Sequence, residues 1–178
     1  LKNIYIPKDK KNNRYEPRDE KYEYNGKSYL VKDLVNIAKE NIDKYIELYT
    51  YTLNNQKSFS LRQALEEELN NIINRINNIS DLDKIYSFML YNEKVLTSRI
   101  GDIFECFAYK YKDLGNKIKY IEALEKCFGS SIEYGFKYFT NVRMDILKIL
   151  IENDYDKTIN YLLNISLDTI LVYPYQGK

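Results

Sequence analysis

Apolar residues recur every three or four positions along most of this 178-residue chain, and this spacing limits the folds open to it. Side chains at that spacing lie on one side of an α-helix and can be buried together as a continuous stripe. The pattern begins at Val31 and continues to Leu163, interrupted by polar and glycine-containing turns. A chain of this length can bury about 70% of its unfolded surface in one core. The sequence therefore predicts an all-α fold, with residues 31–178 forming one helical domain.

Start and stop signals divide this pattern into seven to eight helices. The first helix is expected over residues 31–53, where one apolar stripe continues without a break. Ser60 and Gln63 form a capping box that predicts the start of the next helix, with Phe59 stapling its entry. The clear start at Ser60 separates the long first helix from the second.

The remaining helix boundaries are predicted from glycines and polar caps. Gly115 and Gly129 are expected to end helices, because glycine readily adopts the left-handed conformation of a C-terminal cap. Residues 170–173 are expected to form a short extended tail. Short turns between the helices predict antiparallel hairpins, arranged as an irregular bundle or a short superhelix. The other helix starts are expected at Ser80, Ser98, Asn116, Ser130 or Ser131, Asn141 and Asp154.

Residues 1–30 differ from the rest and are expected to form an extended arm followed by one small β-hairpin. The first 20 residues are polar, contain two prolines and lack a helical period. Asn25 and Gly26 lie between two alternating segments, and this pair favours the type I′ turn of a hairpin. Basic residues are concentrated here, since residues 1–32 hold nine Lys and Arg against five Asp and Glu.

The overall composition argues against several broad classes of protein. The formal net charge of +1 offers no long-range attraction for nucleic acid or an anionic membrane. No apolar run approaches the roughly eighteen residues of a membrane span, so we expect a cytoplasmic protein without a membrane partner. Abundant Asn, Ile, Lys and Tyr indicate an AT-rich bacterial or phage origin. Cys106 and Cys127 are expected to be small buried side chains.

Signatures of catalysis and cofactor binding are missing from the sequence. It contains no histidine, which removes the commonest general base and a common zinc ligand, and it has no glycine-rich phosphate loop. We therefore expect no catalytic residue, cofactor or metal site. A metal-dependent enzyme is the least favoured of the functions considered, and it would use Asp154, Asp156 and Lys157. The competing interpretation is that Asp154 caps a helix and that the three glutamates at 66–68 lie on a solvated face.

The stretch between residues 110 and 120 is rich in lysine and is a candidate for binding anions or nucleic acid. Lys110 and Lys112 fall in the last turn of one expected helix, where cations are favourable. Lys117 and Lys119 fall in the first turn of the next, where cations are unfavourable unless an anion binds there. The alternative is an ordinary helix corner. The basic arm can add to this site through Lys10, Lys11 and Arg14.

Arginines and acids near two expected helix starts are a candidate polar cleft. Arg99, Asp102 and Glu105 share one side of a helix, while Arg143 and Asp145 begin another. A site between them would be polar and functional. The competing interpretation is that arginine at a helix start ties a carboxylate or a loop carbonyl.

Tyrosine-rich helices are expected to contact another protein, because tyrosine contributes large contact area at low entropic cost. The candidates are Tyr45, Tyr49, Tyr134 and Tyr138, each with partial burial as the alternative. The sequence thus favours a non-enzymatic interaction module whose partner is another protein. A toxin-immunity or antitoxin-type protein, or an accessory domain of a larger bacterial, phage or plasmid protein, is expected. Nucleic-acid binding is the second alternative.

Overall fold

The computed structural model describes residues 20–55, 57–96, 100–138 and 143–172, with side chains for all of these except 131–138 and 165–172. Within this part of the chain the fold is all-α, with eight α-helices and one two-stranded hairpin near the N-terminus, as the sequence predicts. The elements are β1 (Lys21–Tyr24), β2 (Lys27–Leu30), α1 (Val31–Ala38), α2 (Ile42–Asn54), α3 (Phe59–Arg75), α4 (Ile79–Tyr91), the 3-10 helix η2 (Glu93–Val95), α5 (Ile100–Asp113), α6 (Lys117–Tyr138), α7 (Met144–Asn153) and α8 (Tyr155–Val172).

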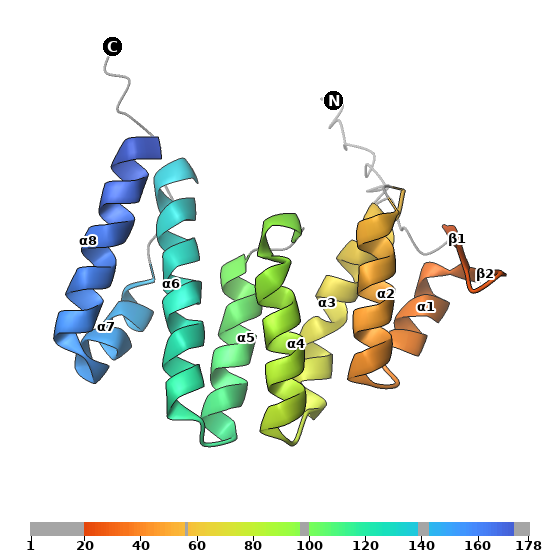
Figure 1. The fold of residues 1–178 in the computed structure, drawn as a ribbon, viewed down its shortest axis with the longest axis horizontal. Coiled ribbons are helices and arrows are strands. Elements are labelled where there is room, and N and C mark those ends of the chain that lie inside the picture. The colour runs from red at the N-terminus through yellow and green to blue at the C-terminus, as the bar shows by residue number, and fades with distance from the viewer. Residues whose placement is uncertain (1–19, 56, 97–99, 139–142, 173–178) are drawn as a thin grey trace, which may run out of the picture.

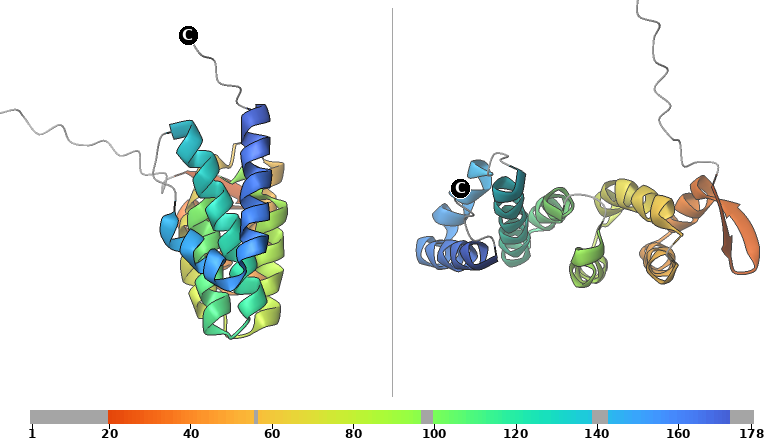
Figure 2. Two further views of the ribbon diagram at one scale, coloured as in Figure 1. Left: turned by 90° about the vertical axis from the view of Figure 1, so that its left-hand side faces the viewer. Right: turned by 90° about the horizontal axis from the view of Figure 1, so that it is seen from above.

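The helices stand side by side in an elongated row, with the hairpin at one end and α8 at the other (Figure 1). Seen from above, α1, α3 and α5 lie in one layer while α2 and α4 lie in the other (Figure 2). Backbone contacts between α1 and α3, between α3 and α5, and between α2 and α4 follow this alternation. Such stacking of successive helical hairpins is the arrangement of a short superhelix.

Buried tyrosines join neighbouring helices in the core. Tyr45, Tyr49, Tyr86 and Tyr111 are each at most 1% exposed. Their hydroxyls donate hydrogen bonds from α2 to α3, from α4 to α6 and from α5 to α4, which leaves none of these polar groups unpaired. The acceptors are the Leu65 carbonyl at 3.2 Å for Tyr45, Glu66 at 2.7 Å for Tyr49, Glu122 at 3.4 Å for Tyr86 and Asp83 at 2.6 Å for Tyr111.

The ring of Tyr86 is the centre of an aromatic cluster between α4 and α5. It meets Phe104, Phe107 and Tyr111 edge to face, with ring centroids 5.5, 5.3 and 5.5 Å away. Pairs of this geometry contribute about 0.5–1.5 kcal/mol each beyond the area that they bury. The cluster therefore holds the middle of the row together.

The hairpin has the turn that its sequence predicts. Asn25 and Gly26 adopt φ values of 51° and 73°, the positive angles that a type I′ turn requires. Tyr22 and Tyr24 point from β1 into the core and are each 7% exposed. The hairpin is therefore packed against the helices through one face.

The expected long first helix is two helices, so the prediction over residues 31–53 is wrong. The first, α1, ends at Ala38, and α2 starts after Asn41, whose side chain accepts a hydrogen bond from the Lys44 amide at 2.9 Å. The apolar stripe continues across the break because three residues separate the helices, which leaves Ala38 and Ile42 at the helical spacing of four positions. Spacing alone therefore did not reveal the turn, whereas the Asn41 cap was a signal for it.

The third helix, α3, starts two residues earlier than its predicted capping box. It begins at Phe59, with Ser58 and not Ser60 as the preceding residue. The hydroxyl of Ser58 donates to the Thr52 carbonyl at 3.0 Å and so closes the α2–α3 turn. Phe59 is 55% exposed, which corrects its expected role as a staple in the core.

Gly129 does not end a helix, and the two helices expected around it are the single helix α6. The hydroxyl of Ser130 accepts a hydrogen bond from the Gly101 amide of α5 at 3.1 Å, so it is used between helices and not as a cap. A Cβ placed on Gly101 would lie 3.5 Å from the Cys127 carbonyl. This close approach of α5 and α6 favours a continuous helix through Gly129.

Other predicted boundaries have mixed outcomes. Asn116 and Asp154 cap α6 and α8 as expected, accepting from the Lys119 and Lys157 amides at 3.1 and 2.9 Å. The start expected at Ser80 is wrong by two residues, since Asn78 is the cap of α4. Residues 170–172 belong to α8 and are not an extended tail. The starts expected at Ser98 and Asn141, and Tyr173 at the end of that tail, lie outside the described residues.

A substitution at Gly115 tests the turn between α5 and α6. This residue has φ +76°, where a Cβ causes strain although no other atom lies within 4 Å of it. We expect Gly115→Ala to lower the free energy of unfolding by about 1 kcal/mol, and Gly115→Asn to lower it less, because asparagine tolerates this conformation. Urea unfolding followed by circular dichroism measures both values. An alanine variant as stable as the wild type would contradict the assignment.

Candidate functional site

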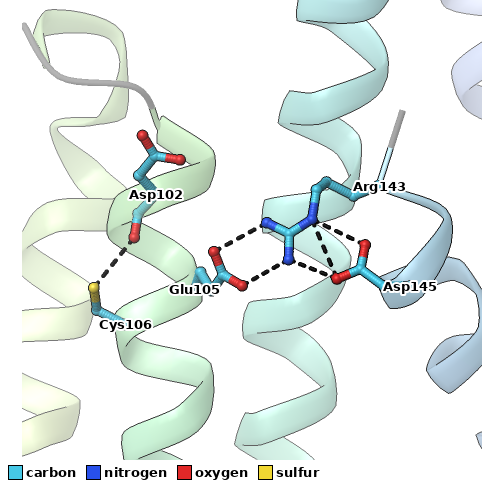
Figure 3. Close-up of polar contacts among 5 residues, drawn as sticks. All are labelled: Asp102, Glu105, Cys106, Arg143 and Asp145. Carbon is cyan, nitrogen blue, oxygen red and sulfur yellow. Dashed lines mark hydrogen bonds and ion pairs between the residues drawn. The ribbon is translucent and has the colours of Figure 1, made fainter. Parts of the chain in front are cut away.

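Arg143 joins the start of α7 to the middle of α5 (Figure 3). Its Nη1 and Nη2 donate to the two carboxylate oxygens of Glu105 at 3.0 and 2.7 Å. Its Nε and Nη2 also donate to Asp145, at 2.9 and 2.7 Å. This bidentate pairing fits the planar geometry of a guanidinium group. One arginine thus holds two acids from two helices.

Local sequence and helix packing together explain how the three side chains meet. Asp145 lies in the first turn of α7, where a carboxylate is favoured by the positive end of the helix dipole. Arg143 directly precedes that helix, and Glu105 lies 38 residues earlier on α5. The packing of α7 against α6, next to α5, brings them together.

The charges of this cluster are strongly coupled. The hydrogen bond from Arg143 holds the pKa of the Asp145 carboxyl below its usual value. In return, the hydrogen bonds to Glu105 and then to Asp145 raise the pKa of the Arg143 guanidinium. Arg143 and Asp145 are therefore ionised near neutral pH, and the carboxyl groups of Glu105 and Asp145 both face one guanidinium.

The expected polar cleft is only partly reproduced. Arg143 pairs with Glu105 and Asp145, whereas Asp102 lies one turn away on α5 without a drawn contact to it (Figure 3). The Asp102 carbonyl instead accepts a hydrogen bond from the Cys106 thiol at 3.3 Å. Arg99 lies outside the described residues. The arrangement matches the competing interpretation of an arginine that ties carboxylates.

Two large side chains beside the cluster are exposed and were missed from the sequence. Tyr109 follows Glu105 by one turn of α5 and is 46% exposed, and burial together with Glu105 raises the pKa of its hydroxyl. Met144 lies between Arg143 and Asp145 and is 63% exposed. Together with the ion-paired Glu105, Arg143 and Asp145, these two residues form what we call the Arg143 surface. The available signal was that Tyr109 falls outside the apolar stripe of α5.

The lysines of residues 110–120 contact different partners within the protein. Lys110 donates to the Asn74 carbonyl at the end of α3, at 2.9 Å. Lys112 lies over the Tyr120 ring, 5.7 Å from its centroid. Both contacts hold the α5–α6 corner in place.

The two lysines at the start of α6 differ from each other. Lys119 donates to Glu122 at 2.9 Å and also lies 5.4 Å from the centroid of the Tyr86 ring. Lys117 is exposed, and among the described residues no contact holds it. One lysine of the expected anion site is thus available to a ligand, and nucleic-acid binding stays a prediction. The expected contributors Lys10, Lys11 and Arg14 lie outside the described residues.

The tyrosines expected to contact a partner are not on the described surface. Tyr45 and Tyr49 are fully buried, and this corrects their expected role. They lie on the inward stripe of α2, where their hydroxyls already have acceptors on α3. Tyr134 and Tyr138 belong to α6, and their side chains lie outside the described residues.

Two of the three residues of the metal-enzyme alternative, Asp154 and Lys157, have structural roles in the fold. Asp154 caps α8, and Lys157 pairs with Glu125 at 2.6 Å. Glu66 is 4% exposed and accepts the Tyr49 hydrogen bond. In the part of the chain that the structure describes, no group of three or more acids or cysteines is arranged to hold a metal ion.

Both cysteines have weakly reactive thiols. Cys127 is buried, and this burial raises the pKa of its thiol to about 12. Burial, with Glu105 and Asp102 adding to it, also raises the pKa of the half-buried Cys106. Thiolate is the reactive form, so neither residue is set up as a nucleophile at neutral pH.

An Arg143→Gln substitution tests the coupling of charges. We expect the pKa of the Asp145 carboxyl to rise towards 3.8 in the variant, as measured by NMR titration. The pKa of Asp145 is lower in the folded protein than in the unfolded chain. The pair with Arg143 therefore stabilises the fold at pH values above the unfolded-state pKa, and this stabilisation is lost as the pH falls through the folded-state pKa. The variant should therefore lose less stability on acidification. Lys148→Gln, which removes an exposed pair on the same helix, is the control.

Thiol labelling tests the state of Cys127. In a Cys106→Ser chain at about pH 8, we expect Ellman's reagent to react with Cys127 at least about a hundredfold more slowly than with the unfolded chain. The reason is that Cys127 is 1% exposed and its thiol is protonated. A rapid reaction in the native state would contradict this.

No family model, curated protein or solved structure matches the chain. Among the described residues, none of the helices combines the length and apolar character that crossing a bilayer requires.

Proposed function

We propose that this chain is a non-enzymatic module that binds another protein through the Arg143 surface. The observation that supports the proposal is the exposure of Tyr109 and Met144 beside the ion-paired Arg143. Tyrosine, methionine and arginine are enriched in protein interfaces relative to other surfaces. The combination suits a contact surface better than it suits a reaction centre.

The geometry of the surface favours tight recognition. Arg143 is held by two carboxylates, so its side chain loses little further freedom when a partner binds. Tyr109 offers a rigid ring, and Met144 adapts its shape to what it meets. Glu105 and Asp145 leave one negative charge in excess. We expect the partner to present an apolar side chain next to lysine or arginine.

Within this class we favour a toxin-neutralising immunity or antitoxin-type protein, or an accessory domain of a larger bacterial, phage or plasmid protein, acting in the cytoplasm. These roles require a stable recognition surface and no chemistry. A helical stack in which Glu66, Asp83 and Glu105 are already paired within the protein suits that requirement.

Affinity purification with matched variants tests the proposal. The tagged chain is used to recover its partner from the source cell, and binding is then measured with the purified partner. We expect Tyr109→Ala with Met144→Ser to weaken binding by about tenfold or more, because the two substitutions remove both large exposed side chains of this surface. Tyr91→Ala is the matched control, since Tyr91 is 89% exposed on α4 and lies outside this surface.

Three outcomes distinguish the alternatives. Equal binding by the double variant would show that the partner uses another surface. Recovery of nucleic acid, with binding that falls steeply with salt and is lost in Lys117→Glu with Lys119→Glu, would support the nucleic-acid alternative. Metal-dependent turnover lost on substitution of Asp154 would support an enzyme.

A further inference from the structure

The C-terminal helices are attached to the rest of the stack by a few buried apolar side chains and by several polar contacts. The Tyr161 hydroxyl on α8 donates to the Glu125 carbonyl on α6 at 2.7 Å. Lys157, also on α8, reaches the Glu125 carboxylate at 2.6 Å. The segment that leads into α7 is attached through Arg143 and Glu105. Long side chains therefore span the space between α6 and α8, whereas α5 and α6 are in close backbone contact.

The burial of side chains decreases towards this end of the chain. In α3, six residues are buried. In α7 only Ile146 and Leu150 are buried, and in residues 155–164 of α8 only Thr158 is buried. Segments with few buried apolar contacts open locally at a lower free energy than the whole domain unfolds.

We propose that residues 143–172, containing α7 and α8, open as a unit from α5 and α6 without unfolding the rest of the protein, and that the Arg143–Glu105 pair controls this opening. The pair is the strongest of the polar attachments. It is bidentate, and its side chains are 33% and 25% exposed, whereas the Lys157 side chain is 58% exposed. A pair that is less exposed to water is screened less by salt.

Opening would separate Arg143, Met144 and Asp145 from Glu105 and Tyr109, which remain on α5. A ligand that binds only the closed form stabilises that form. On the basis of the function proposed above, a partner of the Arg143 surface would therefore hold this unit closed. The opening itself is a property of the free chain and is tested without a partner.

Hydrogen exchange of the full chain, followed by mass spectrometry, tests the inference. We expect amides in residues 144–164 to be less protected than those in residues 59–75. In Arg143→Gln, exchange in the first segment should become about fivefold faster, with no change in the second. Lys84→Gln, which removes the exposed pair with Asp43 between α4 and α2, should leave the first segment unchanged.

Two outcomes would overturn the inference. One is equal protection of both segments in the wild type, which would mean that α7 and α8 open only with the whole domain. The other is an Arg143→Gln variant in which exchange rises equally everywhere or does not change. If that variant does not fold, Glu105→Gln, which removes the same pair from its α5 side, replaces it. Faster exchange confined to residues 144–164 is then the supporting result.

Discussion

Burying tyrosine without leaving its hydroxyl unpaired is the constraint on which the rest of this structure depends. The chain has 19 tyrosines and no tryptophan, and tyrosines from three helices are fully buried. A buried hydroxyl without an acceptor costs about 1–3 kcal/mol. Glu66, Asp83 and Glu122 supply acceptors from adjacent helices, and burial raises the pKa of the tyrosines that they pair with. The hydrogen bonds that allow these tyrosines to be buried therefore also determine which helices are neighbours.

The same pairing leaves few charged groups available for chemistry. Asp83 accepts from a tyrosine, Glu105 and Glu125 pair with arginine or lysine, and Asn116 and Asp154 cap helices. Arg143 follows this rule at the C-terminal end, but its surroundings differ, since Tyr109 and Met144 stay exposed beside it. A stable internal network with a few exposed aromatic and methionine side chains is the basis for proposing recognition over catalysis.

Helix positions were predictable where a local signal specifies them. Asn25 and Gly26 formed the expected turn, and Gly115 with Asn116 formed the expected corner, because the backbone angles needed there are those that glycine and asparagine tolerate. Gly129 carried a similar signal and did not end its helix, since contacts between α5 and α6 outweigh the propensity of one residue. The candidate site was less predictable. Arg143, Glu105 and Asp145 were singled out together, but which acid Arg143 contacts depends on the placement of α7.

The amino-acid sequence by itself determined the helical class and the hairpin, because three-and-four spacing and turn residues act over a few neighbouring positions. Only the tertiary structure decided that the helices alternate between two layers, that Tyr45 and Tyr49 point inward and that Tyr109 lies beside Arg143. The physical reason is that burial and ion pairing depend on contacts between residues far apart in the chain. No local pattern encodes which of several apolar or charged faces will meet.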